Sequence, residues 1–150
     1  MLVPIVMVFF YYNYYELGYL VIAGWSLLSL SIILVLLAGY EFKMKGGHPE
    51  DESIVHTTIL VDSGVYSVVR HPQYFGFILF IFGLVLMSQH WLSVTTGILG
   101  VTLFYFDIVK EEQMSIEKFG DEYREYMNKV PRLNIILGVI QLIKKDGKDK

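Results

Sequence analysis

A run of 24 residues without a charged side chain, residues 17–40, constrains the fold of this chain more than any other feature. About 20 apolar residues in an α-helix are enough to cross the hydrocarbon core of a bilayer. The whole chain is 54% hydrophobic with a mean hydropathy of +0.49, more than a soluble domain of this size needs for its core. Because the excess is concentrated in long runs, we predict a membrane-spanning helix over residues 17–40.

Three further apolar stretches accompany this span. Residues 73–89 and 91–106 are each slightly short, and the turn at Ser88–Trp91 between them predicts a helical hairpin that enters and leaves on one side. Residues 1–15 end in a tyrosine cluster suited to the headgroup region, so they form a short span or an interfacial helix. The prediction is an all-α, polytopic integral membrane protein with three to four spans.

The basic residues predict the orientation of these spans. Residues 41–72 contain three Lys and Arg, and the chain after Phe106 contains the other nine, whereas the turns at 11–19 and 88–91 contain none. The positive-inside rule places both basic regions in the cytoplasm. We predict one multi-pass domain over residues 1–150, with its functional site on the cytoplasmic side. The predicted segments are N-terminal membrane helices (1–40), a cytoplasmic loop (41–72), the helical hairpin (73–106) and cytoplasmic C-terminal helices (107–150).

The C-terminal region contains an amphipathic pattern. Apolar residues recur at three- and four-residue spacing, which is typical of a helix: Ile116, Phe119, Tyr123, Tyr126 and Val130. Gly120 followed by Asp121 predicts a helix stop and a new N-cap, and therefore two short helices. Residues 133–143 are apolar but too short to span, so we expect them at the membrane interface.

Composition excludes several classes of site. The chain has no cysteine, which removes disulfides, thiolate metal ligands and a cysteine nucleophile. A net charge of −3 argues against nucleic acid as a partner. We expect no metal site and no nucleic-acid binding.

The stretch DSGVYSVVRHPQYFGF, residues 62–77, concentrates polar groups at the start of the hairpin. Proline is favoured at the first position of a helix, so Pro72 predicts where this helix begins. Arg70 and His71 then lie at a helix N-terminus, where unpaired N–H groups attract anions. Gly76 and Gly83, seven residues apart, predict close approach of another helix or a ligand.

A simpler interpretation competes with an anion site. Basic side chains at membrane boundaries commonly extend toward lipid phosphates without any further function. Boundary carboxylates such as Glu111 and Glu112 are usually just solvated. The functional interpretation gains weight because these two acids are predicted to lie at the same depth and on the same membrane face as Arg70 and His71.

Two motifs occur in a fixed order: SGVYSVVRHPQYFG is followed about 35 residues later by EEQMSIEKFGDEYREYMNKVPR. Over residues 58–132, this ordered set resembles the C-terminal half of the isoprenylcysteine carboxyl methyltransferase family, which is related to membrane phospholipid methyltransferases. It implies a membrane methyltransferase that uses S-adenosylmethionine and a lipophilic or prenylated acceptor from the bilayer.

The resemblance also implies the site residues. Arg70 and Glu112 are predicted as catalytic residues. The predicted cofactor-binding residues are Thr58, Ile59, Leu60, Val61, Tyr66, His71, Pro72, Gln73, Tyr74 and Glu111. Charged groups at a helix N-terminus suit the carboxylate of the cofactor, Glu111 suits its ammonium or ribose, and the tyrosine rings suit adenine or a cation.

One position departs from the family pattern. Members that methylate a prenylcysteine usually carry an Arg one helical turn before the first of the two acids, and here that position is Asp107. An aspartate repels a carboxylate acceptor, so we expect a neutral or cationic headgroup instead. Two alternatives stay open at this point: a sterol or steroid reductase that uses a reduced nicotinamide cofactor, and a membrane protein without catalytic activity.

Overall fold

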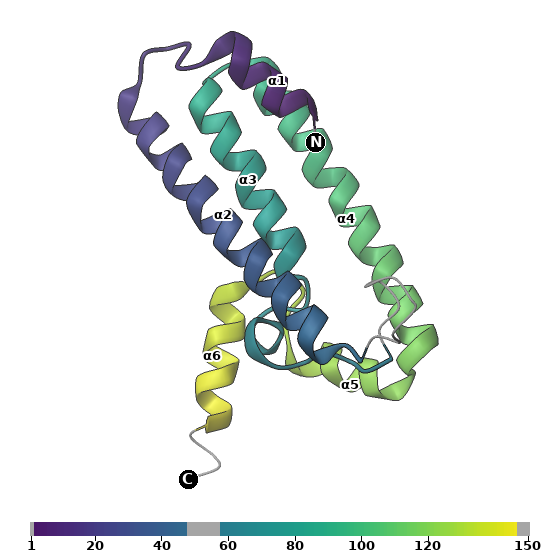
Figure 1. Ribbon diagram of the computed structural model, residues 1–150. Helices are drawn as coiled ribbons and strands as arrows, with labels where there is room; N and C mark the ends of the chain where they lie inside the picture. Colours follow the sequence, from purple (N-terminus) through teal and green to yellow (C-terminus); the bar gives the residue numbers. More distant parts are fainter. Residues whose placement is uncertain (1, 48–57, 147–150) are drawn as a thin grey trace. The chain divides into compact units, whose positions relative to one another are not determined.

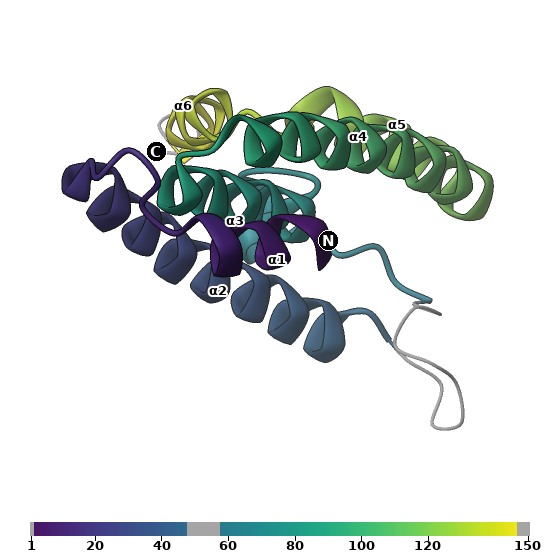
Figure 2. The ribbon, with the colours of Figure 1, turned by 90° about the horizontal axis from the view of Figure 1, so that it is seen from above.

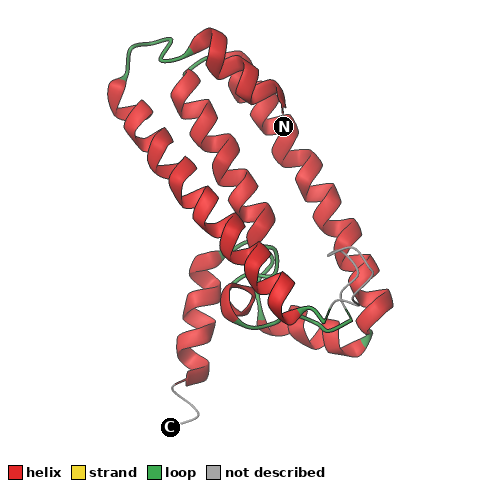
Figure 3. Cartoon of the chain, in the orientation of Figure 1, coloured by secondary structure: helices red, strands yellow, loops and turns green. Residues whose placement is uncertain are grey.

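The computed structural model describes residues 2–47 and 58–146 (Figure 1). All regular secondary structure in these two ranges is helical (Figure 3). The elements are α1 (Leu2–Tyr11), α2 (Gly18–Lys45), the 3₁₀ helix η1 (Gly64–Ser67), α3 (Pro72–Ser88), α4 (Trp91–Phe119), α5 (Asp121–Lys129) and α6 (Ile135–Asp146). The all-α prediction is confirmed for this part of the chain.

The helices form two compact units. The first unit comprises Met1–Val35 and Tyr74–Val109, and the second comprises Leu36–Gln73 and Lys110–Lys150. Helices α2 and α4 each contribute residues to both units. The single domain inferred from the sequence stays a prediction.

In the part of the chain that the structure describes, two helices are long and apolar enough to cross a membrane. Helix α2 has 28 residues and α4 has 29, and at about 1.5 Å per residue both exceed the roughly 30 Å of a hydrocarbon core. Only 22% and 17% of their most apolar segments are buried, whereas the core helix of a soluble protein is mostly covered. These exposed apolar surfaces indicate an integral membrane protein. Helices α1 and α3, with 10 and 17 residues, are shorter, and the count of three to four spans stays a prediction.

In the first unit, α3 lies against α2 through small residues. A Cβ atom on Gly83 would lie 2.9 Å from the carbonyl oxygen of Gly24, so no larger side chain fits there without moving a helix. About two helical turns closer to the start of α3, the Ser31 hydroxyl of α2 donates a 2.8 Å hydrogen bond to the carbonyl of Gly76. The predicted close approach at Gly76 and Gly83 is therefore made, and the partner is helix α2.

Helices α1 and α4 complete the first unit around α3 (Figure 2). Gly97 and Gly100 of α4 lie close to the side chain of Ile81 on α3. On α1, Val8 packs against a buried cluster of α2 and α3 side chains: Leu28, Leu84 and Met87. Helix α3 is thus covered by three neighbours, which explains why it is the apolar helix with the most buried positions.

The hairpin turn is the polar centre of the first unit. Gln89, in the left-handed region at φ 55°, donates from its amide to Asn13 Oδ1 (2.8 Å) and to the Leu17 carbonyl (3.0 Å). Its amide oxygen accepts from the backbone N–H of Leu17 (3.2 Å). The buried ring of His90 stacks on Tyr11 with centroids 4.0 Å apart. The predicted turn at Ser88–Trp91 is confirmed, and the side chains of Gln89 and His90 fix the α1–α2 connection.

In the second unit, one element differs from the sequence prediction. Gly120, with φ 58°, does end a helix, and α5 begins at Asp121 with Gly120 at its N-cap. The preceding helix, however, is not a separate short one, because α4 continues from the apolar segment to Phe119 without a break. Residues 107–119 contain no glycine or proline, and charged residues such as Lys and Glu propagate a helix as well as apolar ones do. The prediction of two short helices was wrong for the first of them.

Two aromatic cores hold the second unit together. The amphipathic stripe found in the sequence forms the larger one, in which Tyr123, Tyr126 and Val130 are buried and Ile116 and Phe119 pack beside them. In the smaller one, Tyr66 packs with Ala38 and Val61. Helix α6 joins this unit through Gly138, whose backbone lies directly against the carbonyl of Val68.

Candidate functional site

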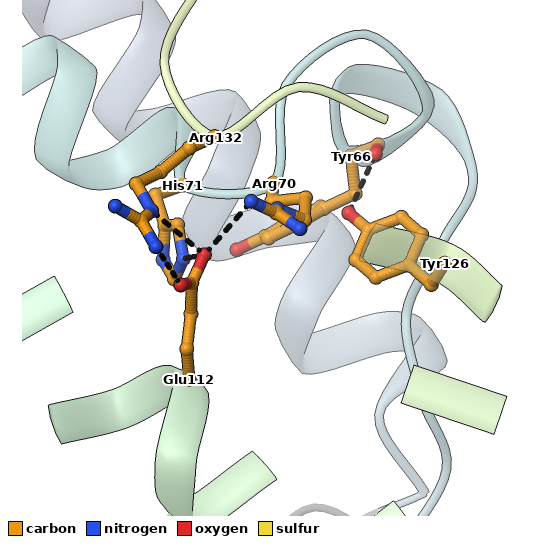
Figure 4. Close-up of polar contacts among 6 residues, drawn as sticks. All are labelled: Tyr66, Arg70, His71, Glu112, Tyr126 and Arg132. Atoms are coloured by element: carbon orange, nitrogen blue, oxygen red, sulfur yellow. Dashed lines mark hydrogen bonds and ion pairs between the residues drawn. The ribbon is translucent and has the colours of Figure 1, made fainter. Parts of the chain in front are cut away.

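A buried carboxylate, Glu112 on α4, gathers three basic side chains in the second unit (Figure 4). Its Oε1 lies 3.0 Å from Arg70 Nη2 and 3.2 Å from His71 Nε2. Arg132 donates from Nε to the same oxygen at 3.1 Å and from its terminal nitrogen to Oε2. Within residues 3–47 and 58–144, Glu112 is the only carboxylate that is buried. We call these four residues the Glu112 cluster.

Backbone pairing places the basic residues of this cluster. Arg70 and His71 directly precede Pro72, which is the first residue of α3, as the sequence predicts. The Arg70 N–H donates to the Pro131 carbonyl (3.0 Å), and the His71 N–H donates to the Arg132 carbonyl (3.3 Å). These two bonds join the segment before α3 to the segment after α5. Glu112 therefore ties together three segments that lie far apart in the sequence.

Glu112 lies on α4 beyond its charge-free residues 91–106, and therefore outside the apolar part of this helix. The electrostatics of the cluster favour the ionised form of its carboxyl group. Burial raises the pKa of this carboxyl, but hydrogen bonds from His71 and Arg132 and the charge of Arg70 outweigh burial and lower it to about 2. Two guanidinium groups then face one carboxylate, so the cluster has one positive charge in excess even with His71 neutral. The Arg70 side chain is only 8% exposed, and its Nε has no hydrogen-bond partner among the described residues. Such a cluster can accept an anionic group.

Three buried tyrosines surround this region as structural groups. The Tyr126 hydroxyl donates a 2.7 Å hydrogen bond to the Tyr66 carbonyl (Figure 4). Burial, followed by the charge of Glu112, raises the pKa of Tyr123 to about 12. Burial is also the largest cause that raises the pKa values of Tyr66 and Tyr126. All three phenols stay neutral at physiological pH, so they pack and donate hydrogen bonds and do not act as bases.

The structure brings together only some of the residues inferred from the sequence. Arg70, His71 and Glu112 are in direct contact, and Pro72 next to them is fully buried. Glu111 is half-buried beside Glu112 on α4.

The remaining predicted residues lie in other surroundings. Thr58 bonds through its N–H to the Gly46 carbonyl (2.9 Å) and through its hydroxyl to Gly47. Leu60, Val61 and Tyr66 belong to the aromatic cores, while Ile59 and Gln73 are exposed. Tyr74 lies in the first unit, edge-on to Phe104 with centroids 5.7 Å apart.

Arg132 is the member of the cluster that the sequence reasoning missed. It closes the motif EEQMSIEKFGDEYREYMNKVPR, which carried the family resemblance, but no role was assigned to it. An available signal was its position directly after Pro131, because a helix usually ends at or before the residue that precedes a proline. Nothing in the residue spacing indicated that this segment would pair with residues 70–71.

Comparison with known proteins identifies the class. The sequence model of the family described as "Phospholipid methyltransferase" matches residues 19–122, more than half of the chain. The chain therefore belongs to the phospholipid methyltransferase family. No solved structure matches the chain at a significant level.

Individual relatives sharpen this assignment. A protein-S-isoprenylcysteine O-methyltransferase from Saccharomyces cerevisiae is 36% identical over 110 residues, which are 67% of this chain and 46% of that protein. The Homo sapiens protein of the same name is 40% identical over 91 residues, 59% of this chain and 31% of that protein. The Xenopus laevis protein is 36% identical over 107 residues, 70% and 36% of the two chains. The chain thus spans less than half the length of these relatives.

Proposed function

We propose that this chain is an integral membrane methyltransferase that transfers a methyl group from S-adenosylmethionine to a lipophilic acceptor. The observation that carries the proposal is the Glu112 cluster, a buried site with excess positive charge, in a chain of the phospholipid methyltransferase family. Relatives named protein-S-isoprenylcysteine O-methyltransferase support the reaction type. The alternative reductase activity has no support among these relatives.

The residues of the second unit fit the chemistry of this methyl donor. S-adenosylmethionine supplies an electrophilic methyl group on a sulfonium, together with a carboxylate, an ammonium and a ribose diol. The unpartnered Nε of Arg70 and the excess charge of the cluster suit the carboxylate. Glu111, half-buried on the same helix, suits the ammonium or the diol. These groups would bind and orient the donor, because methyl displacement depends mainly on alignment and exclusion of water.

Glu112 has a different role in this proposal from Arg70. Its two oxygens are already occupied by Arg70, His71 and Arg132. It therefore acts as a positioning residue that holds the basic groups in place. Arg70 is the residue that we place in contact with the donor.

The acceptor is proposed from the charge at Asp107. This residue is exposed on α4, one helical turn before Glu111. An anionic acceptor would meet a like charge there, whereas a neutral or amine headgroup would not. We propose a lipid with such a headgroup, dissolved in the bilayer, as the preferred acceptor.

Equilibrium titration of the purified protein tests the cofactor. We expect binding of S-adenosylmethionine and of its demethylated product, and none of reduced nicotinamide cofactor. His71→Ala and Glu111→Gln should each weaken binding by roughly ten- to hundredfold, since a charge-assisted hydrogen bond contributes about 1.5–3 kcal/mol. Glu125→Gln, at an exposed position of α5, is the matched control. Unchanged affinity in both site variants would contradict the site, and binding of the nicotinamide cofactor alone would contradict the reaction.

Transfer of labelled methyl groups tests the acceptor. A farnesylated cysteine analogue and an aminophospholipid are compared side by side, with the wild type and with Asp107→Arg. We expect the wild type to prefer the aminophospholipid, and the variant to gain activity on the farnesylated cysteine. Efficient methylation of the farnesylated cysteine by the wild type would refute the charge argument.

The multi-pass topology with a cytoplasmic site is also part of the proposal. Single cysteines can be introduced without a background, because the chain contains none. Met44→Cys and Glu122→Cys, both exposed, should react with an impermeant thiol reagent only after the cytoplasmic face is opened. Tyr15→Cys should react in intact cells if α2 is a span. Labelling of positions 44 and 122 from opposite sides would contradict this topology.

A further inference from the structure

Helix α6, the last helix of the second unit (Figure 1), exposes an apolar face. Ile136 is 75% exposed and Ile143 is 65% exposed. The other large apolar side chains on the same face are exposed as well: Leu137, Val139 and Ile140. At about 100° per residue these five positions form one continuous arc of roughly 160° around the helix. A contiguous apolar surface of this kind indicates a binding surface.

The opposite face of α6 fixes how this surface is presented. A Cβ atom at Gly138 would collide with the backbone carbonyl of Val68, so only glycine allows this contact. Gln141 and Leu142, on the same side as Gly138, are partly buried. The Asn134 side chain accepts a 3.0 Å hydrogen bond from the Leu137 N–H and caps the start of the helix. The helix therefore cannot rotate to bury its apolar arc without losing these contacts.

Helix α5 shows that such exposure is not general in the second unit. Its exposed positions are charged or polar: Asp121, Glu122, Arg124, Glu125, Asn128 and Lys129. Its apolar side chains Tyr123 and Tyr126 are buried. Helix α5 thus has the ordinary polarity of a helix in contact with water, and α6 has the reverse polarity on its exposed side.

The charge at the end of α6 indicates what binds its apolar face. Residues 144–150 contain four Lys and two Asp, a net charge of +2 directly after the apolar arc. Basic residues beside a membrane are attracted to anionic lipid headgroups by about 1 kcal/mol each. An apolar helix face next to a basic segment matches an interfacial helix, and the described residues also include two helices long and apolar enough to cross a membrane.

We propose that α6 is docked on an anionic bilayer leaflet, with its Ile136–Ile143 face in the acyl boundary and its basic end among the headgroups. This docking is independent of the methyl transfer proposed above. It depends only on the surface of the second unit.

Spin labels on single cysteines in lipid nanodiscs test the docking. Ile136→Cys and Ile140→Cys report on the apolar arc, and Glu125→Cys on α5 is the control; all three positions are exposed, so the labels should not disturb packing. In nanodiscs with anionic lipid, we expect the α6 labels to collide with oxygen and to be protected from a water-soluble nickel complex. The α5 label should show the reverse pattern.

The remaining outcomes would show that water or another protein, and not lipid, covers the apolar face of α6. High nickel accessibility at positions 136 and 140 would overturn the proposal. Protection from both oxygen and nickel would also overturn it, because a second copy or another protein would then cover the face. Lys144→Glu should make the α6 labels more accessible to nickel in anionic nanodiscs but not in zwitterionic ones. An equal change in both lipids would overturn the assignment to anionic headgroups.

Discussion

The two units of this chain are stabilised by opposite kinds of interaction. The first unit is held by close helix contacts at Gly24 and Gly83 and by a neutral amide, Gln89, that bonds to Asn13 and Leu17. The second is held by aromatic cores and by the ionised Glu112. In a unit built around apolar spans, neutral groups satisfy one another without the cost of burying a charge. The second unit bears that cost, which is consistent with a functional role for its charges.

Removing the charge of Glu112 is the strongest way to break the second unit. We expect Glu112→Gln to lower the free energy of unfolding of this unit by about 3–5 kcal/mol, because the buried guanidinium of Arg70 and the half-buried one of Arg132 lose their charged partner. Chemical unfolding in nanodiscs or detergent measures this change. Glu111→Gln, one residue earlier and half-buried, should change stability by less than about 0.5 kcal/mol. Equal effects of the two substitutions would contradict the central role of Glu112.

Low pH should destabilise the second unit, because protonation also removes the charge of Glu112. The folded-state pKa of Glu112 is lowered from 4.5 to about 2. A lowered carboxyl pKa stabilises the fold fully above the unfolded value and loses that contribution as the pH falls through the folded value. We expect a loss of about 3 kcal/mol between pH 4.5 and about 2. The free energy of unfolding, measured as a function of pH, should lose this pH dependence in the Glu112→Gln variant. An unchanged pH profile in the variant would show that other groups cause the acid destabilisation.

The helix contact of the first unit is broken by a single methyl group. Gly83→Ala places a Cβ atom 2.9 Å from the Gly24 carbonyl, and such overpacking costs about 1–3 kcal/mol. Gly39→Ala, the same substitution in α2, meets nothing within 4 Å and should stabilise the helix by up to about 1 kcal/mol. Thermal stability of the two variants should change in opposite directions. A neutral result for Gly83→Ala would show that α2 and α3 can separate freely.

Gln89→Glu at the hairpin turn replaces an amide by a carboxylate, the reverse of the substitution Glu112→Gln. Gln89→Glu keeps an acceptor for the Leu17 N–H but loses the two amide donors. Each lost hydrogen bond should cost roughly 1 kcal/mol. Cysteine accessibility at Tyr15 reports local opening of the connection, and unfolding reports the global change. If Gln89→Glu were neutral while Glu112→Gln was severe, the turn would be less important than its bonds indicate.

Periodicity, length and special residues were enough to predict the helices. All of the charge-free run after Leu17, residues 18–40, lies inside α2, Pro72 starts α3, and Gly120 ends α4. These features act locally, since helix propensity, proline geometry and glycine conformation depend on a few neighbouring residues. The same reasoning erred between Phe106 and Phe119, where a change in polarity suggested a boundary. Polarity reports the surroundings of a helix and does not interrupt its hydrogen bonds.

The sequence by itself therefore determined the all-helical class, the long apolar helices, and the placement of Arg70 and His71 directly before α3 and of Glu112 beyond the apolar part of α4. Only the tertiary structure decided that Glu112 is the buried acid of the adjacent pair, and that Arg132 shares it with Arg70 and His71. The reason is that the pairing of residues 70–71 with 131–132 is a backbone contact between distant segments. Such contacts depend on how loops close and pack, and side-chain spacing along one helix carries no information about them.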